Sequence, residues 1–554
     1  MNAAWWKTAV VYQIYPRSFA DSDGDGIGDL GGIIERLDHL HDLGVDVIWL
    51  SPIYRSPQTD NGYDVSDYRD IDPLFGTLAD FDGLIAKVHA LGMKLVMDLV
   101  VNHTSDEHPW FVDSRSARGN PKRDWYIWRD ARGGAVPNNW ESFFSGPAWQ
   151  WDEFTGQYYL HLFARKQPDL NWANPDVRKA LRDMMVWWLD RGVDGFRMDV
   201  INFISKADGL PDTISPQQRF VVGDAVHTYL AELADTVFDG RAGEFLTIGE
   251  MPGVTTEEAR LYTDPARGEL DMVFQFEHMS VDQRPENKFD DIGLDLVALK
   301  TALHRWQSAL ADVGWNSLYW NNHDQPRVVS RFGDDHPDHW AASAKALAAV
   351  LHGMRGTPFV YQGEEIGMTN YPFRFPQEYA DIESVNYFRS VLDQGWDSAA
   401  ALAGLAKMSR DNARTPMQWD AGPHAGFSSE KPWLPVNPNH SWLNVAAQTA
   451  AADSVLAHYR ALIRLRHELP VLVDGDFTPV MADDPQIWAY TRATAQEKLL
   501  VIANCGRTTR TVDVGLEWMS AELVLGNVSG TAAALTSTSL ALSGWEARIY
   551  CLGS

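Results

Sequence analysis

Cysteine is scarce in this sequence of 554 residues, which contains only Cys505 and Cys551. So few cysteines exclude a disulfide scaffold and fit a reducing compartment, although a single bridge stays open. The N-terminus lacks a basic segment followed by a sustained apolar stretch, so we expect no secretory signal. Long hydrophobic runs are also missing, because the apolar run at residues 8–15 is too short to span a bilayer. These absences predict a cytoplasmic protein without a membrane partner.

Basic residues are outnumbered, with 47 Lys and Arg against 75 Asp and Glu and a net charge of −28 at pH 7. Such a surface repels phosphate backbones and anionic lipids, which argues against nucleic-acid and membrane partners. Tryptophan, by contrast, is abundant at 23 residues. Flat aromatic faces suit sugar rings, but a large aromatic core would have the same composition. The length favours two or three domains, and no pattern indicates the oligomeric state.

A unit of helix, glycine and buried strand recurs in the first part of the chain. Phe81, Leu84, Ile85 and Val88 fall on one face of a helix that Gly92 ends. An apolar strand follows at residues 95–100, and its continuous hydrophobicity is typical of a strand buried on both faces. The same unit is predicted twice more, with helices at 33–43 and 181–189 and strands at 45–50 and 193–200.

Five further short apolar runs complete a set of eight predicted strands, at residues 10–15, 245–248, 272–276, 318–321 and 358–361. Alternating strands and helices imply a parallel sheet. Eight such strands predict an α/β fold of the closed (β/α)₈ TIM-barrel type. A doubly wound open sheet is the alternative that periodicity does not exclude.

Two regions depart from this alternation and define the predicted domains. Residues 104–172 show no clear helical period and hold seven of the tryptophans, so we expect a subdomain inserted after the third strand. The barrel should comprise residues 1–103 and 173–477. After a last helix at 454–466, short strands separated by turns predict a C-terminal antiparallel β-sandwich domain at 478–554.

Four carboxylates lie within, at the end of or directly after predicted strands: Asp98, Asp199, Glu250 and Asp324. In a barrel, functional groups gather at the C-terminal ends of the strands. Arg197 precedes Asp199 by two residues, so both side chains point to the same side of the strand. A guanidinium beside a carboxylate favours the ionised form that a nucleophile needs. One such residue alone would be read as a salt bridge or cap, but four at one barrel mouth predict a site.

The motifs around these residues resemble glycoside hydrolase family 13, the α-amylase superfamily, in the branch of oligo-1,6-glucosidases and related α-glucosidases. The matching segments are residues 11–16, 98–103, 167–172 and 410–416, together with those around Asp199, Glu250 and the pair His323-Asp324. They occur in the family's order over nearly the whole chain. The resemblance implies a retaining exo-acting α-glucosidase that releases glucose from short oligosaccharides and uses no organic cofactor.

The resemblance also implies the roles of individual residues. Asp199 would be the nucleophile, Glu250 the general acid and then base, and Asp324 the group that holds the sugar 2- and 3-hydroxyls. Glu250 must then be protonated while Asp199 is ionised, and a less cationic environment for Glu250 would achieve this. The remaining substrate-binding residues implied around the first sugar are His103, Gln167, Arg197 and His323.

Exo action and linkage preference rest on four further residues. Asp60 and Arg410 resemble the pair that grips the terminal glucose and closes the far end of the site, and Tyr63 would stack on that sugar. Val200 follows the nucleophile, where valine resembles α-1,6-preferring enzymes and alanine or threonine resembles α-1,4-preferring ones. A β-branched wall at the leaving-group site is the physical reason we assign to this preference.

An acidic loop after the first strand has carboxylates at the spacing of a calcium loop. Its predicted ligands are Asp21, Asp23, Asp25, Ile27 and Asp29, although position 12 is Gly32 where an EF-hand has glutamate. The family carries a similar metal loop, so we expect a structural Ca²⁺, with Mg²⁺ as the alternative. A solvated acidic turn without metal would have the same pattern.

Three functions compete. The first is hydrolysis of α-1,6 or α-1,4 linkages, and the second is glucosyl transfer or isomerisation on the same covalent intermediate. The third is a non-catalytic relative such as a transporter-accessory subunit, which typically loses catalytic carboxylates and carries a membrane helix. This chain keeps the carboxylates and lacks an apolar span, which favours the enzymes.

Overall fold

A closed barrel of eight parallel strands forms the centre of the computed structural model, which describes residues 4–215, 218–238, 244–530 and 532–553. The strands are β1 Val11–Ile14, β2 Val47–Leu50, β5 Lys94–Leu99, β9 Gly195–Met198, β10 Leu246–Glu250, β11 Met272–Phe274, β14 Ser317–Tyr319 and β15 Thr357–Tyr361. Seven parallel pairings link them in the order β11-β10-β9-β5-β2-β1-β15-β14. A parallel bridge between Val273 and Asn316 joins the two outer strands. The predicted barrel is confirmed, and the open sheet is excluded.

Local sequence signals explain the helices that follow the first strands. Helix α1 (Leu30–Leu43) begins at Asp29, whose side chain accepts a hydrogen bond from the Gly32 N–H, and ends at Gly44 with φ 93°. Helix α2 (Leu78–Ala90) begins with a capping box between Thr77 and Asp80. The third predicted helix is α4, Pro175–Asp190. These helices confirm the predicted alternation and extend beyond the predicted bounds, because the caps lie outside the apolar pattern.

Further helices cover the barrel: α5 Val226–Leu233, α6 Thr256–Tyr262, α7 Leu296–Ala309, α9 Trp340–His352 and α14 Val455–Glu468. The barrel strands are buried along nearly their whole length. Their side chains and the inner faces of the helices form one continuous hydrophobic core. Polar groups in the barrel therefore gather where the strands end.

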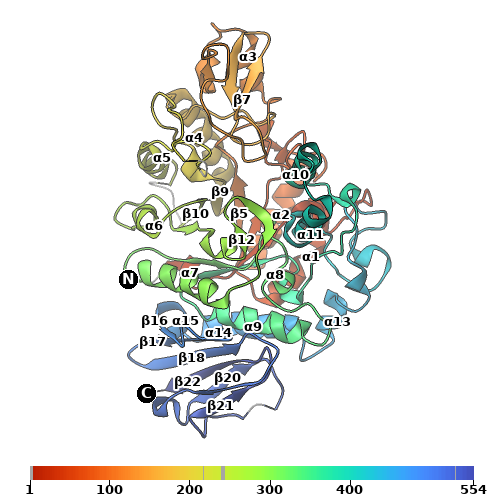
Figure 1. The fold of residues 1–554 in the computed structure, drawn as a ribbon, viewed down its shortest axis with the longest axis vertical. Helices are drawn as coiled ribbons and strands as arrows, with labels where there is room; N and C mark the ends of the chain where they lie inside the picture. Colours follow the sequence, from red (N-terminus) through yellow and green to blue (C-terminus); the bar gives the residue numbers. More distant parts are fainter. Residues whose placement is uncertain (1–3, 216–217, 239–243, 531, 554) are drawn as a thin grey trace.

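The segment after β5 forms a small unit with its own sheet. It contains helix α3 (Pro109–Ser116) and an antiparallel sheet in the order β6-β8-β7, with strands Trp128–Arg129, Gln157–Leu160 and Trp149–Asp152. This unit lies at the end of the molecule opposite the C-terminal sheet (Figure 1). Its aromatic residues pack on each other, as Phe111 does on Trp128 with ring centres 5.6 Å apart.

The C-terminal region is antiparallel, as predicted. Its main sheet has the order β16-β17-β18-β22-β20, formed by Asp476–Val480, Ile487–Ala493, Glu497–Asn504, Ala547–Gly553 and Glu522–Gly526. A second sheet pairs β19 (Arg510–Asp513) with β21 (Ser539–Leu542). The domain boundaries stay predictions, and their outer limits at residues 1 and 554 lie outside the described residues. Cys505 and Cys551 are both free thiols.

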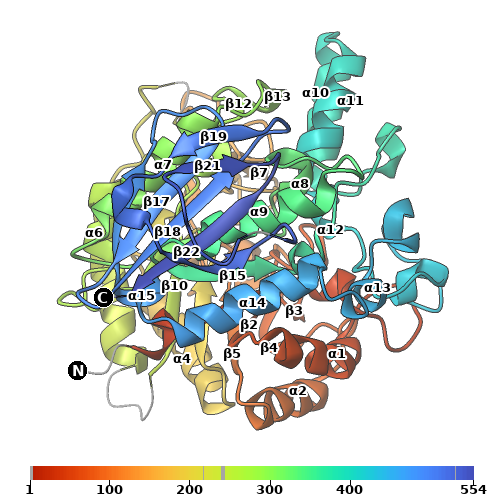
Figure 2. The ribbon, with the colours of Figure 1, turned by 90° about the horizontal axis from the view of Figure 1, so that it is seen from below.

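A helical hairpin that the sequence analysis did not predict follows β15. Helices α10 (Ile382–Gln394) and α11 (Ser398–Met408) project side by side from the barrel (Figure 2). Strand β13 (Asn287–Asp291), which pairs with β12 (Gln283–Arg284), packs against α11. Among the described residues, no helix combines the length and apolar composition needed to cross a membrane.

Candidate active site

One arginine gathers three of the predicted carboxylates. Arg197 Nη1 donates to Asp98 Oδ1 and to Asp199 Oδ1, both at 2.8 Å, and its Nη2 lies 2.7 Å from Glu250 Oε1. The register of the sheet explains the convergence, because Arg197 in β9 pairs with Asp98 in β5 and lies next to β10, which ends at Glu250. We call Asp98, Arg197, Asp199 and Glu250 the Arg197 cluster. Arg197 is only 1% exposed, so this charge balance is set inside the protein.

The Arg197 cluster has more negative than positive charge, and its proton affinities reflect this. Burial raises the pKa of Asp98 to about 6, against the opposing effect of Arg197. Burial and the neighbouring Glu250 raise the pKa of Asp199 well above its usual value, and Arg197 opposes this shift as well. The expected less cationic environment of Glu250 is not found, because Arg197 contacts both carboxyl groups. Asp199 therefore retains a proton beyond the usual carboxyl range, because it is buried next to Glu250.

Val200 combines strained backbone with a contact to the cluster. Its φ of 36° and ψ of 43° are left-handed, which is a rare conformation for a β-branched residue and costs about 1–3 kcal/mol. In this conformation its N–H donates to Glu250 Oε2 at 3.1 Å. Its side chain is 6% exposed and belongs to an apolar cluster with Phe203 and Phe220. The backbone of Val200 thus orients Glu250, while its side chain faces an aromatic wall.

Tyr63 and His323 connect the Arg197 cluster to Asp324. The Tyr63 hydroxyl donates to Asp98 Oδ2 at 3.0 Å and lies 2.7 Å from His323 Nε2, which is 3.2 Å from Asp324 Oδ2. The rings of Tyr63 and His323 stack at 5.2 Å, so one face of Tyr63 is covered and a sugar can stack only on the other. Burial lowers the pKa of His323 to about 3, so this imidazole is neutral at pH 7.

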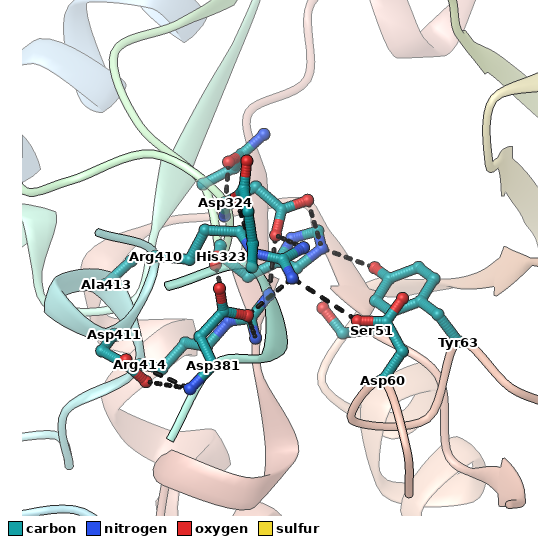
Figure 3. A network of polar contacts seen from close by, with 12 residues as sticks. Ser51, Asp60, Tyr63, His323, Asp324, Asp381, Arg410, Asp411, Ala413 and Arg414 are labelled. Atoms are coloured by element: carbon teal, nitrogen blue, oxygen red, sulfur yellow. Dashed lines mark hydrogen bonds and ion pairs between the residues drawn. The ribbon is translucent and has the colours of Figure 1, made fainter. Parts of the chain in front are cut away.

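Two arginines, Arg410 and Arg414, surround Asp324 and two further carboxyl groups (Figure 3). Asp324 Oδ1 accepts hydrogen bonds from Arg410 Nη1 at 3.2 Å and from Arg414 Nη2 at 2.7 Å. Asp381 Oδ1 lies 2.6 Å from Arg410 Nη2 and 3.2 Å from Arg414 Nη1. Asp60 Oδ1 lies 3.5 Å from Arg410 Nη2. We call these residues, Asp60, Asp324, Asp381, Arg410 and Arg414, the Arg410 cluster.

The Arg410 cluster keeps most of its carboxylates ionised. Burial acts to raise the pKa of Asp324, but His323, Arg410 and Arg414 together hold it well below its usual value. The pKa of Asp381 is likewise lowered, because Arg410 and Arg414 outweigh the effect of burial. Asp60 differs, because burial raises its pKa to about 7 despite Arg410. The two arginines thus supply fixed charge, and only Asp60 changes charge near neutral pH.

His103 and Gln167 lie between the two clusters. Gln167 Nε2 donates to Asp60 Oδ2 at 3.0 Å and to the Tyr63 carbonyl at 3.2 Å. His103 Nε2 lies 3.0 Å from the same carbonyl, and burial lowers the pKa of His103 to about 4. The structure therefore brings all eleven predicted catalytic and substrate-binding residues to one end of the barrel. Their individual roles stay predictions.

Three residues of the site were missed in the sequence. Gln13 holds His323 through a 2.8 Å contact between its Nε2 and the Nδ1 of the imidazole, and Arg414 holds Asp324. Both lie inside segments that carry the family resemblance, so their motifs could have indicated them. Asp381 lies outside every recognised motif, just before α10. Only the fold brings it to Arg410.

The acidic loop forms a partial cation site. Asp21, Asp23 and Asp29 each place a carboxylate oxygen within 4.8 Å of the others. Asp25 is not part of this group, and its Oδ1 accepts a hydrogen bond from the Ile27 N–H at 2.7 Å. Gly26 has φ 89°, as the sharp turn of such a loop requires, and its N–H donates to Asp21 Oδ2 at 2.8 Å. Three convergent carboxylates form an oxygen donor set that fits a hard cation.

Comparison with known proteins agrees with this geometry. The chain matches the alpha amylase catalytic domain over residues 13–475. It is 53% identical over 560 residues to an oligo-1,6-glucosidase of Halalkalibacterium halodurans and 51% identical over 561 residues to one of Parageobacillus thermoglucosidasius, with 99% of each chain covered. A solved trehalulose synthase variant is 44% identical with a TM-score of 0.96, covering 99% of this chain and 100% of that one. The chain belongs to the alpha-amylase family of glycoside hydrolases.

Proposed function

We propose that this glycoside hydrolase is a retaining, exo-acting α-glucosidase that releases glucose from the non-reducing end of short α-glucosides and prefers α-1,6 linkages. The observation that carries the proposal is the pair of carboxyl groups, Asp199 and Glu250, on neighbouring nitrogens of Arg197. A retaining mechanism needs its two carboxyls roughly 5–5.5 Å apart, whereas an inverting one needs roughly 6.5–9.5 Å. A shared guanidinium favours the shorter spacing. Two relatives named oligo-1,6-glucosidase support the linkage.

In the proposed first step, an Asp199 oxygen attacks the anomeric carbon of the terminal glucose, and the bond to the glycosidic oxygen breaks. Glu250 gives its proton to that departing oxygen, and a β-glucosyl-enzyme forms. This step requires Asp199 to be ionised and Glu250 to be protonated, and the glycosidic oxygen that enters beside Glu250 is the acceptor for that proton. In the second step, Glu250 takes a proton from water and the water oxygen attacks the anomeric carbon. The bond between that carbon and the Asp199 oxygen breaks, the carboxylate of Asp199 is restored, and α-glucose leaves.

The Arg410 cluster would grip the sugar. Asp324 is the most exposed of its carboxylates, with 27% of its side chain accessible, so it can accept the 2- and 3-hydroxyls. Asp60 Oδ1 is buried and has no hydrogen-bond partner within the part of the chain that the structure describes. A buried acceptor without a donor is costly unless a ligand supplies one. Glucose hydroxyls would supply it, and Arg410 beside Asp60 would close the far end of the site against longer chains.

The linkage preference is assigned to Val200. Its side chain, together with Phe203 and Phe220, would form the apolar wall on which the flexible leaving group of an α-1,6 substrate packs. The test is glucose release from isomaltose and from maltose, compared as kcat/KM in one buffer. A strong preference for isomaltose is expected. A preference for maltose would refute the assignment to Val200 while leaving the exo mechanism intact.

Glucosyl transfer or isomerisation is the second candidate, because a trehalulose synthase is a close structural neighbour. Both activities would use the same β-glucosyl-enzyme and differ only in whether water or a sugar attacks it. Incubation with sucrose separates them. Free glucose and fructose are expected from hydrolysis, whereas an isomeric disaccharide would identify the synthase activity.

We also infer that the acidic loop holds a structural Ca²⁺, bound by Asp21, Asp23 and Asp29. The ion would compensate the mutual repulsion of these carboxylates and fix the loop ahead of α1. Mg²⁺ is the alternative, because it also takes oxygen ligands but demands a tighter octahedral arrangement. The two free thiols fit the reducing cytoplasm as the proposed location.

A further inference from the structure

A groove of about 660 Å³ runs beside the α10–α11 hairpin, outside both clusters of the active site. Strand β13 and the Phe143 segment contribute to its lining along with the hairpin. We call it the hairpin groove. Its aromatic and polar wall includes Phe143, Lys288, Phe289, Tyr387, Gln394 and Trp396. Its size and its mixture of aromatic and hydrogen-bonding side chains are those of a ligand site.

The inner end of the hairpin groove reaches the Arg410 cluster. Glu383 lines the groove, and its Oε2 lies 3.6 Å from Arg410 Nε. Lys288 on the opposite wall forms an ion pair with the same carboxylate. One residue therefore separates the groove from the arginine that would grip the terminal glucose. Phe143, which also lines the groove, stacks on Phe203 with ring centres 5.3 Å apart, so the groove borders the apolar wall assigned to the leaving group as well. A substrate whose non-reducing end lies at Asp60 and Arg410 would send its remaining units past that wall and into the groove.

The outer end of the groove is marked by an exposed tryptophan on a rigid turn. Trp396 is 57% exposed, yet its backbone is fixed by a Schellman motif at the end of α10. Its N–H donates to the Val391 carbonyl at 3.0 Å, and the N–H of Gly395, with φ 67°, donates to the Leu392 carbonyl at 3.1 Å. Asp397 then caps α11 by accepting from two backbone N–H groups. The indole is thus presented on an ordered hairpin tip.

The Schellman motif explains why an apolar residue follows Gly395, but not why this residue is as large as Trp396. The motif usually includes an apolar contact between the residue after the glycine and the helix. The corresponding helix residue here is Val391, which is buried and lines the groove together with Trp396. A leucine would be large enough for that contact, and Trp396 remains more than half exposed. Deeper in the groove, Tyr387 stacks on Phe289 with ring centres 4.4 Å apart and accepts a hydrogen bond from Asn287 Nδ2. The groove wall is therefore preorganised.

We propose that the hairpin groove is a distal sugar-binding site, in which Trp396 stacks on glucosyl units toward the reducing end of longer isomalto-oligosaccharides. This proposal rests on the exo-glucosidase function proposed above. The flat apolar face of a pyranose fits an exposed indole, and Lys288 and Gln394 offer hydrogen bonds to its hydroxyls. Isomaltose leaves only one unit beyond the cleaved bond, so it ends near Glu383. Longer chains reach the tip, and the contribution of Trp396 depends on chain length.

The experiment compares kcat/KM for isomaltose and isomaltotetraose in the wild type and in Trp396→Ala. We expect Trp396→Ala to lower the value for isomaltotetraose about tenfold, mainly through KM, and to leave isomaltose unchanged. Trp396→Tyr should retain most of the wild-type value, because it keeps a flat ring. Phe375→Ala is the matched control, since Phe375 is an equally exposed aromatic residue that lies before α10 and outside the groove lining.

Equal losses on both substrates, or no loss on either, would overturn the proposal. Binding of isomaltotetraose to Asp199→Asn and to Asp199→Asn/Trp396→Ala, measured by calorimetry, keeps the two proposals separable. Weaker binding of isomaltotetraose by the double variant would support the proposed site in the groove, whatever the activity of the wild type. If the wild type hydrolysed no isomaltose, that result would refute only the proposed function. Unchanged binding together with normal hydrolysis would refute only the groove.

Discussion

In the Arg197 cluster one guanidinium faces three carboxyl groups, whereas in the Arg410 cluster two guanidiniums hold Asp324 and Asp381 between them. The clusters are adjacent, joined by Tyr63 and His323, and both are buried. Burial therefore does not explain why the pKa values of Asp98 and Asp199 rise in the first cluster, whereas those of Asp324 and Asp381 fall in the second. The ratio of cations to anions around these carboxyl groups explains the difference in their pKa values. The first cluster can hold and release a proton, and the second presents fixed charge to sugar hydroxyls.

The largest effect is expected from Asp199→Asn. The amide cannot act as the nucleophile, so kcat for isomaltose should fall by at least about 10⁴-fold, while the fold is retained. Steady-state rates together with circular dichroism check this. Activity close to that of the wild type in a folded variant would place the chemistry outside the Arg197 cluster.

The next largest effect is expected on stability, and it should differ between the two clusters when an arginine of each is replaced. Arg197→Met leaves three buried carboxyls without their cation and should destabilise the protein by about 3–5 kcal/mol. Arg410→Met should cost less, because Arg414 still contacts Asp324 and Asp381. Thermal unfolding of the two variants is the measurement. Equal losses would contradict the difference in charge balance between the clusters.

Asp381→Asn tests whether the Arg410 cluster binds rather than reacts. Asparagine caps α10 as well as aspartate does, but it holds Arg410 and Arg414 only weakly. We expect KM for isomaltose to rise about 10–100-fold with a smaller change in kcat. Asp397→Asn, at the cap of α11, is the matched control, because Asp397 contacts no arginine among the residues that the structure describes. A loss of kcat with constant KM would assign Asp381 to the chemical step.

Val200→Thr should change linkage preference while keeping the shape of the side chain. Its backbone contact to Glu250 is preserved, so activity remains, but the hydroxyl makes the apolar wall at Phe203 and Phe220 polar. The ratio of kcat/KM for isomaltose to that for maltose should fall by about tenfold. Assays on both disaccharides measure it, and an unchanged ratio would remove Val200 from the specificity account.

The smallest effects concern stability against pH, and their signs should be opposite. The pKa of Asp98 is raised to about 6, so the wild type loses stability as the pH rises from about 4 to 6, by up to about 1.4 kcal/mol per pH unit. The pKa of Asp324 is lowered, so its contribution is lost as the pH falls below about 4. The thermal midpoint of Asp98→Asn should rise relative to that of the wild type as the pH increases from about 4 to 6. Asp324→Asn should have a lower thermal midpoint than the wild type at neutral pH, and this difference should shrink as the pH falls below about 4.

Much of this arrangement was predictable from the sequence, for physical reasons. Parallel strands end at one edge, so apolar runs that end in Asp199 and Glu250 had to bring these carboxyls together. Asp381 was not predictable, since it lies in an insertion whose position over the barrel depends on tertiary packing. The shared contact of Arg197 with Glu250 was also missed, because side-chain direction across neighbouring strands depends on register. The α10–α11 hairpin shows no strand-like or catalytic pattern, so its groove emerged only from the fold.

The most direct test of the account is the anomeric form of the first glucose released from isomaltose, followed by proton NMR in the first minutes of reaction. Double displacement through Asp199 predicts that α-glucose appears first and converts to the β form only by mutarotation. Initial release of β-glucose would mean a single displacement by water, and it would contradict the assignment of Asp199 and Glu250 as nucleophile and acid on one guanidinium.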